Sequence, residues 1–201
     1  MGEAFLAGVL SSGWTTADRV RVVEAAPARR EELYLRYPGV EVATMPGAAE
    51  GTIVAVKPGD VADAVIGVVA AGGGRIVSIA AGVSLAALEA AAGPGVPVVR
   101  AMPNTPALVA RGASAIVAGS WAGEADLDWA ERLLSSIGIV ERVPEQLIDA
   151  VTGVSGSGPA YLFLLAEAMI EAGVLVGLTR PVAERRVVAL RGEDPAGGVE
   201  E

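Results

Sequence analysis

The residues best suited to chemistry lie in four short segments of a chain that contains neither histidine nor cysteine. Lys57 is the single lysine, and every other basic residue is an arginine. Without these two residue types there is no thiolate nucleophile, no histidine-dependent triad and no usual metal site. What remains is one ammonium group, amides, hydroxyls and backbone groups, which bind and position ligands. The segments are VAVKPGDV (54–61), SIAAG (78–82), MPNTP (102–106) and SGSGP (155–159).

The elements that must position these segments follow an alternating pattern. Short apolar runs alternate with helical patterns, which predicts the α/β class with a doubly wound, mostly parallel sheet. Near-continuous aliphatic strands indicate cover on both faces of that sheet. Strands are expected at 19–24, 40–43, 52–56, 75–80, 96–101, 113–119 and 138–143. Helices are expected at 3–12, 27–36, 59–71, 84–92 and 123–136.

The pattern changes at Pro144, from which the chain reads as helical with a glycine–serine interruption at 153–158. The domains are therefore expected at 1–143 and 144–191, with a breaker-rich, acidic and disordered tail at 192–201. The helix at 159–176 is apolar nearly all round, so we expect it to be buried in a core or against another subunit. Glu167 and Glu171 are read as its solvated strip, with a catalytic acid pair as the alternative.

Net charge and the length of the apolar runs exclude some classes of binding partner. The formal charge of −9 argues against nucleic acid or an anionic membrane surface. No uncharged run reaches the roughly 18 residues of a membrane span, and the first residues lack the basic region of a signal peptide. We therefore expect a soluble protein of the cytoplasm.

The amino-terminal segment reads as the end of a longer feature. In sheets that bind dinucleotides, the first strand runs into G-x-G-x-x-G, whose third glycine allows close helix–strand packing. Gly2 fits that third glycine, and Glu24, 22 positions onward, fits the acidic residue that binds the adenosine ribose. The alternative for Glu24 is a surface charge that precedes a helix.

The four segments, together with the helical stretch that follows Val151, resemble the pyrroline-5-carboxylate reductase family from Met1 to about Ala183. The most specific elements are R-x-MPNTP and VSGSGPAY. The resemblance implies a Rossmann-type domain, an all-helical domain that interlocks into homodimers or larger homo-oligomers, and reduction of 1-pyrroline-5-carboxylate to L-proline by NADPH or NADH.

The resemblance also implies roles for individual residues. Cofactor binding falls to Gly2, Glu24, Ala55, Val56, Lys57, Pro58, Ile79, Ala80, Ala81, Gly82 and Asn104. Substrate binding falls to Ser155, Gly156, Ser157 and Gly158, since free N–H groups at a helix start form an anion site. The alternatives are a solvated strand-end lysine at 57, close helix–sheet packing at 79–82, turn capping by Asn104 and plain helix capping by the serines.

Glu24 favours NADH, because a carboxylate repels the 2′-phosphate of NADP, although Arg29 and Arg30 follow closely and can offset it. Two family features are missing from the sequence: the first strand with its glycine-rich loop, and a Ser/Thr-Pro-Gly-Gly-Thr-Thr loop that helps to bind substrate. The catalytic residue is therefore unknown. In the order 3-2-1-4-5-6, loss of the first strand leaves two strand edges unpaired. We expect the 201-residue chain to be a marginally stable fragment without activity.

Two alternatives remain at this point. Another Rossmann reductase, such as a β-hydroxyacid dehydrogenase or an imine reductase, has the same architecture but leaves VSGSGPAY unexplained. A non-catalytic fragment would use the apolar helix at 159–176 to pair with a complete reductase subunit.

Overall fold

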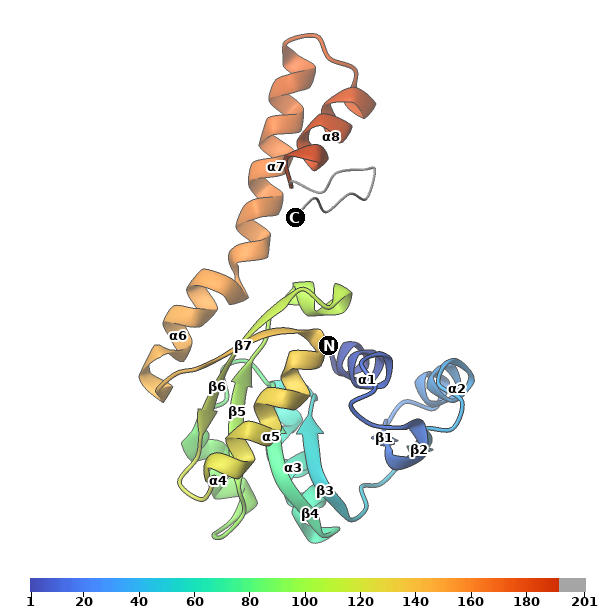
Figure 1. Cartoon of the computed structure of the whole chain (residues 1–201), viewed down its shortest axis with the longest axis vertical. Helices are drawn as coiled ribbons and strands as arrows, with labels where there is room; N and C mark the ends of the chain where they lie inside the picture. Colours follow the sequence, from blue (N-terminus) through green and yellow to red (C-terminus); the bar gives the residue numbers. More distant parts are fainter. Residues whose placement is uncertain (192–201) are drawn as a thin grey trace. The chain divides into compact units, whose positions relative to one another are not determined.

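The computed structural model describes residues 1–191 and divides the chain into two compact units, Met1–Gly156 and Ser157–Glu201 (Figure 1). Each unit is described by itself. The expected disordered tail at 192–201 lies outside the described residues. The first unit extends beyond the domain boundary expected at residue 143, because Ile148 is buried in its core.

A five-stranded sheet forms the centre of the first unit, in the order β3-β4-β5-β6-β7. All neighbouring strands are parallel except the antiparallel pair β5–β6, which confirms the predicted mostly parallel sheet. The strands are β3 (Ala49–Val54), β4 (Gly73–Ser78), β5 (Val98–Met102), β6 (Gly112–Ala118) and β7 (Gly138–Arg142).

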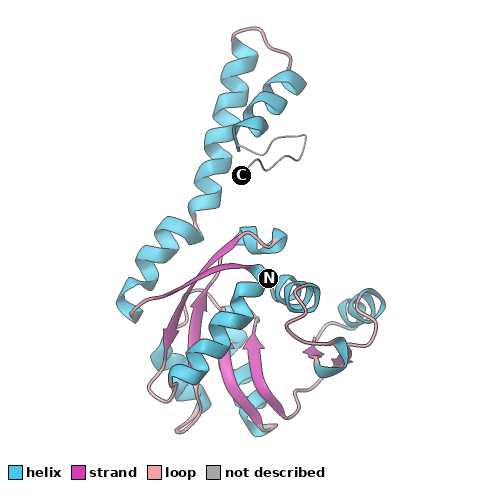
Figure 2. Ribbon diagram, viewed as in Figure 1, coloured by secondary structure: helices cyan, strands magenta, loops and turns pink. Residues whose placement is uncertain are grey.

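Helices cover both faces of this sheet (Figure 2). One apolar cluster joins the sheet to α1 (Gly2–Ser11) and α5 (Glu124–Leu134). The other cluster joins it to α3 (Val61–Ala70), α4 (Leu85–Ala92) and α6 (Ile148–Val151). Ile76, Val77 and Ser78 are consecutive and all buried, as a strand covered on both faces requires. The single-turn 3-10 segments are η1 (Ala17–Arg19), η2 (Pro58–Asp60), η3 (Thr105–Val109), η4 (Ser135–Ile137) and η5 (Glu145–Leu147).

A second sheet contains two parallel strands, β1 (Arg21–Val23) and β2 (Glu41–Ala43), connected by α2 (Pro27–Arg36). Among residues 1–191, β1 pairs with β2 alone and β3 with β4 alone. The expectation that two strand edges lack a partner is thus confirmed for the described chain.

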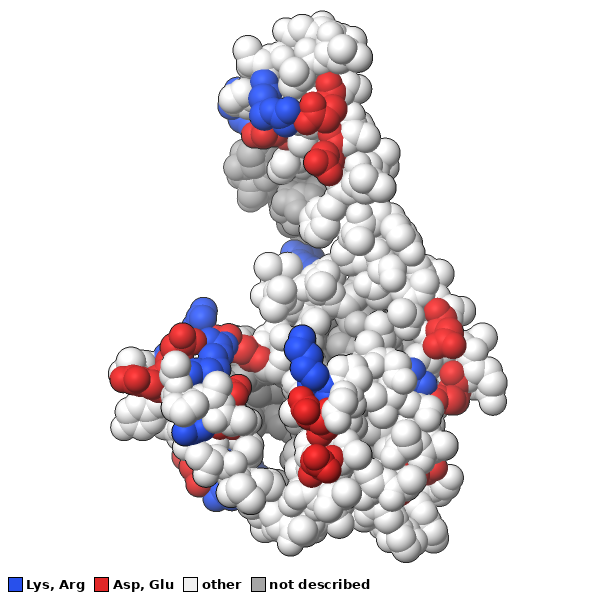
Figure 3. Space-filling model, turned by 180° about the vertical axis from the view of Figure 1, so that it is seen from behind, with Lys and Arg blue, Asp and Glu red and all other residues white. Residues whose placement is uncertain are grey.

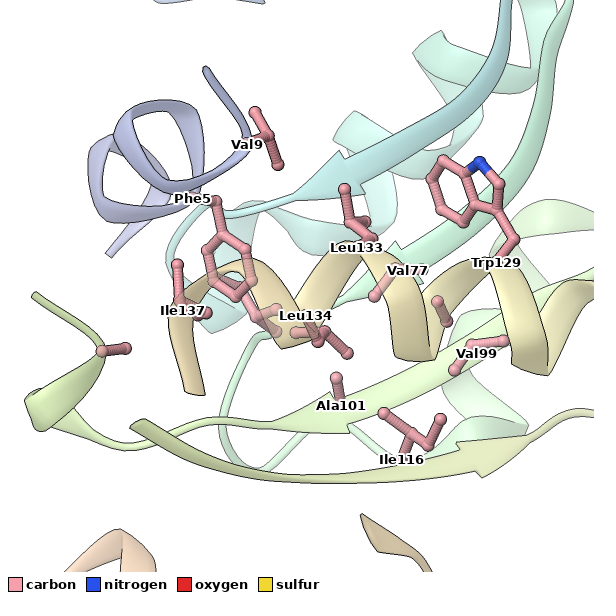
Figure 4. Packing of buried hydrophobic residues seen from close by; sticks show 13 residues of the cluster. Phe5, Val9, Val77, Val99, Ala101, Ile116, Trp129, Leu133, Leu134 and Ile137 are labelled. Atoms are coloured by element: carbon pink, nitrogen blue, oxygen red, sulfur yellow. The ribbon is translucent and has the colours of Figure 1, made fainter. Parts of the chain in front are cut away.

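Helix α1 holds the two sheets together by packing in two directions. Phe5 and Val9 enter the cluster formed with Leu133, Leu134 and the central strands, as Figure 4 shows. Leu6 instead packs with Leu33 and Val40 of the β1–β2 region, and Leu10 contacts both clusters. The two sheets therefore share one helix even though their strands do not pair.

Ion pairs reinforce the contact between α1 and α2. Glu3 pairs with Arg29 and, at 2.9 Å, with Arg36, and its carboxylate accepts a 3.1 Å hydrogen bond from the Tyr37 hydroxyl. Burial alone would raise the pKa of Glu3. The hydrogen bonds from Arg29 and Tyr37 and the two guanidinium charges outweigh it, so the pKa lies below its ordinary value of 4.5.

This lowered pKa predicts how acid affects stability. A carboxyl group whose pKa is depressed in the folded state stabilises it above the unfolded-state pKa, and that contribution is lost as pH falls through the folded-state pKa. Urea unfolding from about pH 6 to about pH 3 should show a smaller acid-induced loss of stability for Glu3→Gln than for the parent chain. Glu31→Gln, on the exposed side of α2, is the control and should follow the parent. Identical acid sensitivity in all three proteins would contradict the prediction.

The second unit contains α7 (Gly158–Leu175), α8 (Arg180–Val188) and η7 (Ala189–Arg191). Gly173 lets the two long helices approach, since a Cβ there would lie 3.2 Å from that of Ala183. Glu171 pairs with Arg180 at 2.7 Å, with both side chains exposed. Glu167 is exposed as well, but the apolar residues of α7 are also exposed, so the described residues do not distinguish a solvated strip.

The apolar side chains of α7 are exposed, and among its described residues none is buried. Five consecutive ones, Tyr161 to Leu165, are 57 to 72% exposed. On the face seen in Figure 3, charged side chains of this unit gather in one cluster and leave much of the surface uncharged. Residues 157–191 thus form no core that buries α7, and the expectation of burial against another subunit stays a prediction.

Candidate functional site

Three parallel strands end at the same edge of the sheet. The register aligns Val54 of β3 with Ser78 of β4, and Ser78 with Arg100 of β5. The Ile79 N–H donates to the Val54 carbonyl at 3.1 Å, which continues the ladder one residue further. The loops that contain Lys57, Ala81 and Asn104 consequently leave the sheet at one edge, where open α/β sheets bind ligands.

The amino end of α1 lies at this edge. Gly2 is its first residue, and a Cβ added there would lie 3.1 Å from the Cβ of Ala55. That separation is tighter than ordinary contact, so a larger residue would push the helix away from the loop after β3. The close approach is what the third glycine of a dinucleotide fingerprint provides.

The loop after β3 differs from the prediction in one respect. The strand covers 49–54 rather than 52–56, so Ala55 and Val56 belong to the exposed loop and not to the strand. Lys57 follows them, and its carbonyl accepts from Asp60 N–H at 2.9 Å as η2 begins. Its side chain is exposed and forms no ion pair with any residue in the range 1–191. The ammonium group is thus available to an anionic ligand.

The loop after β4 has a buried half and an exposed half. Ile79 and Ala80 are buried, whereas Ala81 and Gly82 are exposed. Gly82 has a φ of +76°, a left-handed conformation that favours glycine. The turn therefore presents backbone and small side chains at the edge, which leaves room for a flat ring.

Asn104 is buried, and both polar atoms of its side chain are engaged. Nδ2 donates to the Ser155 carbonyl at 3.0 Å, and Oδ1 accepts from the Ala113 N–H at 2.8 Å. The alternative that Asn104 caps its own turn is wrong, because its side chain makes no cap bond to η3. The carboxamide ties its loop to β6 and to the segment at 155, instead of projecting towards a ligand as predicted.

The glycine–serine segment divides between the two units. Ser155 and Gly156 lie in a π-helical turn, η6 (Thr152–Gly156), of the first unit. A Cβ at Gly156 would lie 2.9 Å from the Met102 side chain, so glycine lets this turn approach the end of β5. Ser157 and Gly158 begin the second unit and precede Pro159 at the start of α7. The structure thus places half of the predicted substrate segment at the sheet edge.

Glu24 follows β1 directly, as expected for a residue at a strand end. One of its carboxylate oxygens accepts from the Ala26 N–H at 2.9 Å, before α2 begins. Arg30 donates to the carbonyls of Glu24 and Ala25 at 2.9 and 2.7 Å. Arg29 is engaged by Glu3 and Glu32.

One pair of charged residues at this edge was missed by the sequence interpretation. Arg100, in β5, is 8% exposed and its Nη1 donates to Glu145 Oε1 at 2.6 Å. The signal was an arginine inside the otherwise apolar run VPVVRA. Its partner, 45 residues away, could not be identified from the sequence.

Two surface hollows lie away from this edge. One of about 450 Å³ is lined by Trp14, Asp128, Glu131, Arg132, Ser135 and Arg142. The other, of about 330 Å³, lies at the amino ends of β4 and β5, where Gly73 and Pro97 line it. Neither contains a residue of the predicted site.

Comparison with known proteins identifies the family. Residues 145–191 match a family model described as pyrroline-5-carboxylate reductase dimerisation. The pyrroline-5-carboxylate reductase of Corynebacterium melassecola is 40% identical over 94% of this chain and 73% of its own length. The chain belongs to the pyrroline-5-carboxylate reductase family. The reductase of Mycobacterium tuberculosis is 43% identical over 91% of this chain and 65% of its own length.

Solved structures agree with the family assignment. A pyrroline-5-carboxylate reductase from Coxiella burnetii superposes with a TM-score of 0.84 at 26% identity, covering 98% of this chain and 82% of its own. A pyrroline carboxylate reductase of Plasmodium falciparum, solved with NADP bound, superposes with a TM-score of 0.80 at 23% identity, covering 96% of this chain and 72% of its own. Prephenate dehydrogenase from Aquifex aeolicus gives 0.64 at 14% identity over 98% of this chain and 76% of its own, which shows the fold alone. The family assignment removes the alternative of a different Rossmann reductase.

Proposed function

We propose that this chain binds a reduced nicotinamide dinucleotide at the edge formed by β3, β4 and β5 and takes part in reducing 1-pyrroline-5-carboxylate to L-proline. The observation that carries the proposal is the placement of the family segments: the loops after three parallel strands, and Ser155–Gly156, meet at one edge. The chain spans 73% of the length of the Corynebacterium melassecola reductase and 65% of that of the Mycobacterium tuberculosis reductase. The activity of the whole protein is therefore part of the proposal.

The residues at the edge fit such a cofactor. Gly2 brings the amino end of α1, with its free N–H groups, beside Ala55, and this arrangement favours an anionic phosphate. Ala55, Ala81 and Gly82 offer exposed small side chains and backbone for the nicotinamide, next to Val56, Lys57 and Pro58 of the loop after β3 and buried Ile79 and Ala80 of the loop after β4. The cofactor supplies the hydride, which reduces the C=N bond of the protonated imine, and the oxidised nicotinamide and L-proline are the products. The chain holds the two reactants close together.

The substrate carboxylate is assigned to the glycine–serine segment. Asn104 fixes the Ser155 carbonyl, and Gly156 allows that turn to approach Met102. Ser157 and Gly158, at the start of α7, are assigned to substrate by the family resemblance alone, since N–H groups at the start of a helix attract anions.

We propose a preference for NADH. Glu24 would repel a 2′-phosphate, and the two arginines that could offset it have other partners: Arg30 bonds to backbone carbonyls and Arg29 pairs with two glutamates. The preference is checked by comparing the Kd of NADH and NADPH. A lower Kd for NADPH would contradict it.

Lys57 offers a direct test of the site. Lys57→Ala should raise the Kd of NADH about tenfold, because one ion pair with a cofactor phosphate is lost, while Lys57→Arg should retain most of the affinity. Binding is followed by cofactor fluorescence. Arg111→Ala, which removes one positive charge from the exposed loop after η3, controls for net charge. Equal affinity for the parent and Lys57→Ala would favour the solvated-lysine alternative.

Turnover decides between an enzyme and an assembly partner. NADH oxidation in the presence of 1-pyrroline-5-carboxylate would establish activity and contradict the expected inactivity of the 201-residue chain. Cofactor binding without turnover would favour the alternative in which this chain pairs with a complete reductase subunit. Absence of both would overturn the proposal.

We also propose that residues 145–191 form a homodimer, because they match the dimerisation family and expose the apolar side chains of α7. By length and composition alone, the helical stretch Glu145–Leu175 is apolar enough to cross a membrane, unlike the sequence expectation. In the proposed homodimer a second subunit, rather than lipid, covers the apolar side chains of α7. On this ground we propose that the protein is cytoplasmic.

A further inference from the structure

The pair formed by buried Arg100 and partly exposed Glu145 joins three elements that lead into the site. Glu145 Oε1 accepts from Arg100 Nη1 at 2.6 Å and from the Leu85 N–H at 3.1 Å. Arg100 lies in β5, four residues before Asn104 in the following loop. Leu85 begins α4 just after the turn Ile79–Gly82, and Glu145 begins the segment that ends at Ser155 and Gly156. A single carboxylate oxygen therefore connects β5, α4 and the segment 145–156.

The surroundings of this pair are mainly apolar. Side chains alternate along a strand, so Arg100 shares a face of β5 with Val98 and Met102, which both pack in the cluster beneath α3 and α4. Glu145 Oε2 is buried and is the one such side-chain atom without a partner among residues 1–191. Apolar replacement of a buried pair is often neutral or stabilising, so stability alone does not explain this one. A role in fixing the position of the segment 145–156 explains it.

The segment 145–156 depends on a few contacts to stay on the first unit. Glu145 holds its beginning, Ile148 is buried in the core, and Asn104 holds the Ser155 carbonyl near its end. Helix α4 depends less on Glu145, because Ser84 caps it and Leu85 and Leu88 are buried. Loss of the carboxylate should therefore release the segment while α4 stays in place.

We propose that Arg100 and Glu145 are positioning residues that fix the segment 145–156, and with it Ser155 and Gly156, for substrate binding. The inference deepens the proposed function and rests on it for the identity of the substrate. Whether the segment 145–156 stays packed on the first unit can be measured without any enzymatic activity.

Hydrogen exchange provides that measurement. In Glu145→Ala the amides of 148–156 should exchange at least about tenfold faster than in the parent, while those of 76–79 in β4 stay within about twofold. Asn104→Ala, at the other end of the segment, should accelerate the same amides. Glu171→Ala, which breaks the exposed pair with Arg180, is the matched control and should leave 148–156 unchanged. If Glu145→Ala does not fold, Glu145→Gln retains an acceptor for Leu85 and should give a smaller acceleration confined to the same amides.

Kinetics test the positioning role for substrate. In the chain, or in the dimer that it forms, Glu145→Ala should raise KM for 1-pyrroline-5-carboxylate at least about tenfold and change KM for NADH by less than about twofold. An equal rise in KM for both ligands would show a general structural role and overturn the inference. Faster amide exchange at 76–79 together with 148–156 would do the same. Unchanged exchange at 148–156 would also overturn it. If the parent shows no turnover, the proposed activity fails, and the exchange result still decides whether the pair docks the segment.

Discussion

Replacing Phe163 with aspartate is expected to dissociate the proposed homodimer into monomers. Phe163 is 72% exposed in the single chain and lies within the run from Tyr161 to Leu165. These positions surround α7 at 100° steps, so a partner must contact more than one side of the helix to cover them. Burying a carboxylate in such an interface, after loss of an aromatic anchor, should raise the dimer Kd at least about a hundredfold.

Sedimentation velocity over a range of concentrations measures this shift, and far-UV circular dichroism shows whether helix content is preserved. The matched control is Leu35→Asp, since Leu35 is 71% exposed on α2, outside the region 145–191. It should leave the Kd unchanged. A parent chain that is monomeric at all concentrations, or a Phe163→Asp variant that dimerises as tightly as the parent, would contradict a dimer through α7.

The second large effect is expected from an added strand. The edges of β1 and β3 have no strand partner among residues 1–191, although α1 packs against the cores of both sheets. We expect a fusion of six valine and isoleucine residues followed by Gly-Ala-Gly-Ala, placed before Met1, to pair with both edges. Because each satisfied backbone group contributes about 1 kcal/mol or more, the free energy of unfolding should rise by roughly 3 kcal/mol or more.

The fusion also completes the G-x-G-x-x-G spacing with Gly2, so the Kd of NADH should fall as well. A control fusion of equal length, with glycine and serine in place of the aliphatic residues, should leave stability unchanged. Urea unfolding measures the first effect and cofactor fluorescence the second. Equal midpoints for the two fusions would show that no strand enters between β1 and β3.

The central strands β4, β5 and β6 could be predicted because each contains a run of buried residues. Ile76 to Ser78 are apolar or small and all buried, which the sequence pattern indicates directly. The start of β3 was placed too late, at residue 52, whereas the strand begins at Ala49 and includes Gly51. In the structure a Cβ at Gly51 would lie 2.5 Å from the Trp129 ring, so the indole occupies the space above the strand. A glycine required by a residue 78 positions away leaves no local signal.

The site was predicted only in part for a similar reason. The loops after β3, β4 and β5 follow from the rule that parallel strands end at one edge. The role of Asn104 depends on Ala113 and Ser155, and the latter is 51 residues away. Arg100 likewise depends on Glu145. Such long-range hydrogen bonds arise from tertiary packing, whereas periodicity and turn chemistry describe neighbours in the chain.

Because α1 packs in two directions, substitutions in this helix are expected to require compensating changes in both of its surroundings. Phe5 and Val9 pack in the core of the central sheet, and Leu6 packs with Leu33 and Val40 beside β1 and β2. A substitution that tilts this one helix should therefore disturb the packing of both sheets at once. Variation in α1 should be compensated by simultaneous changes near Val40 and near Ile137, which are nearly 100 residues apart in the chain but both pack near the same helix.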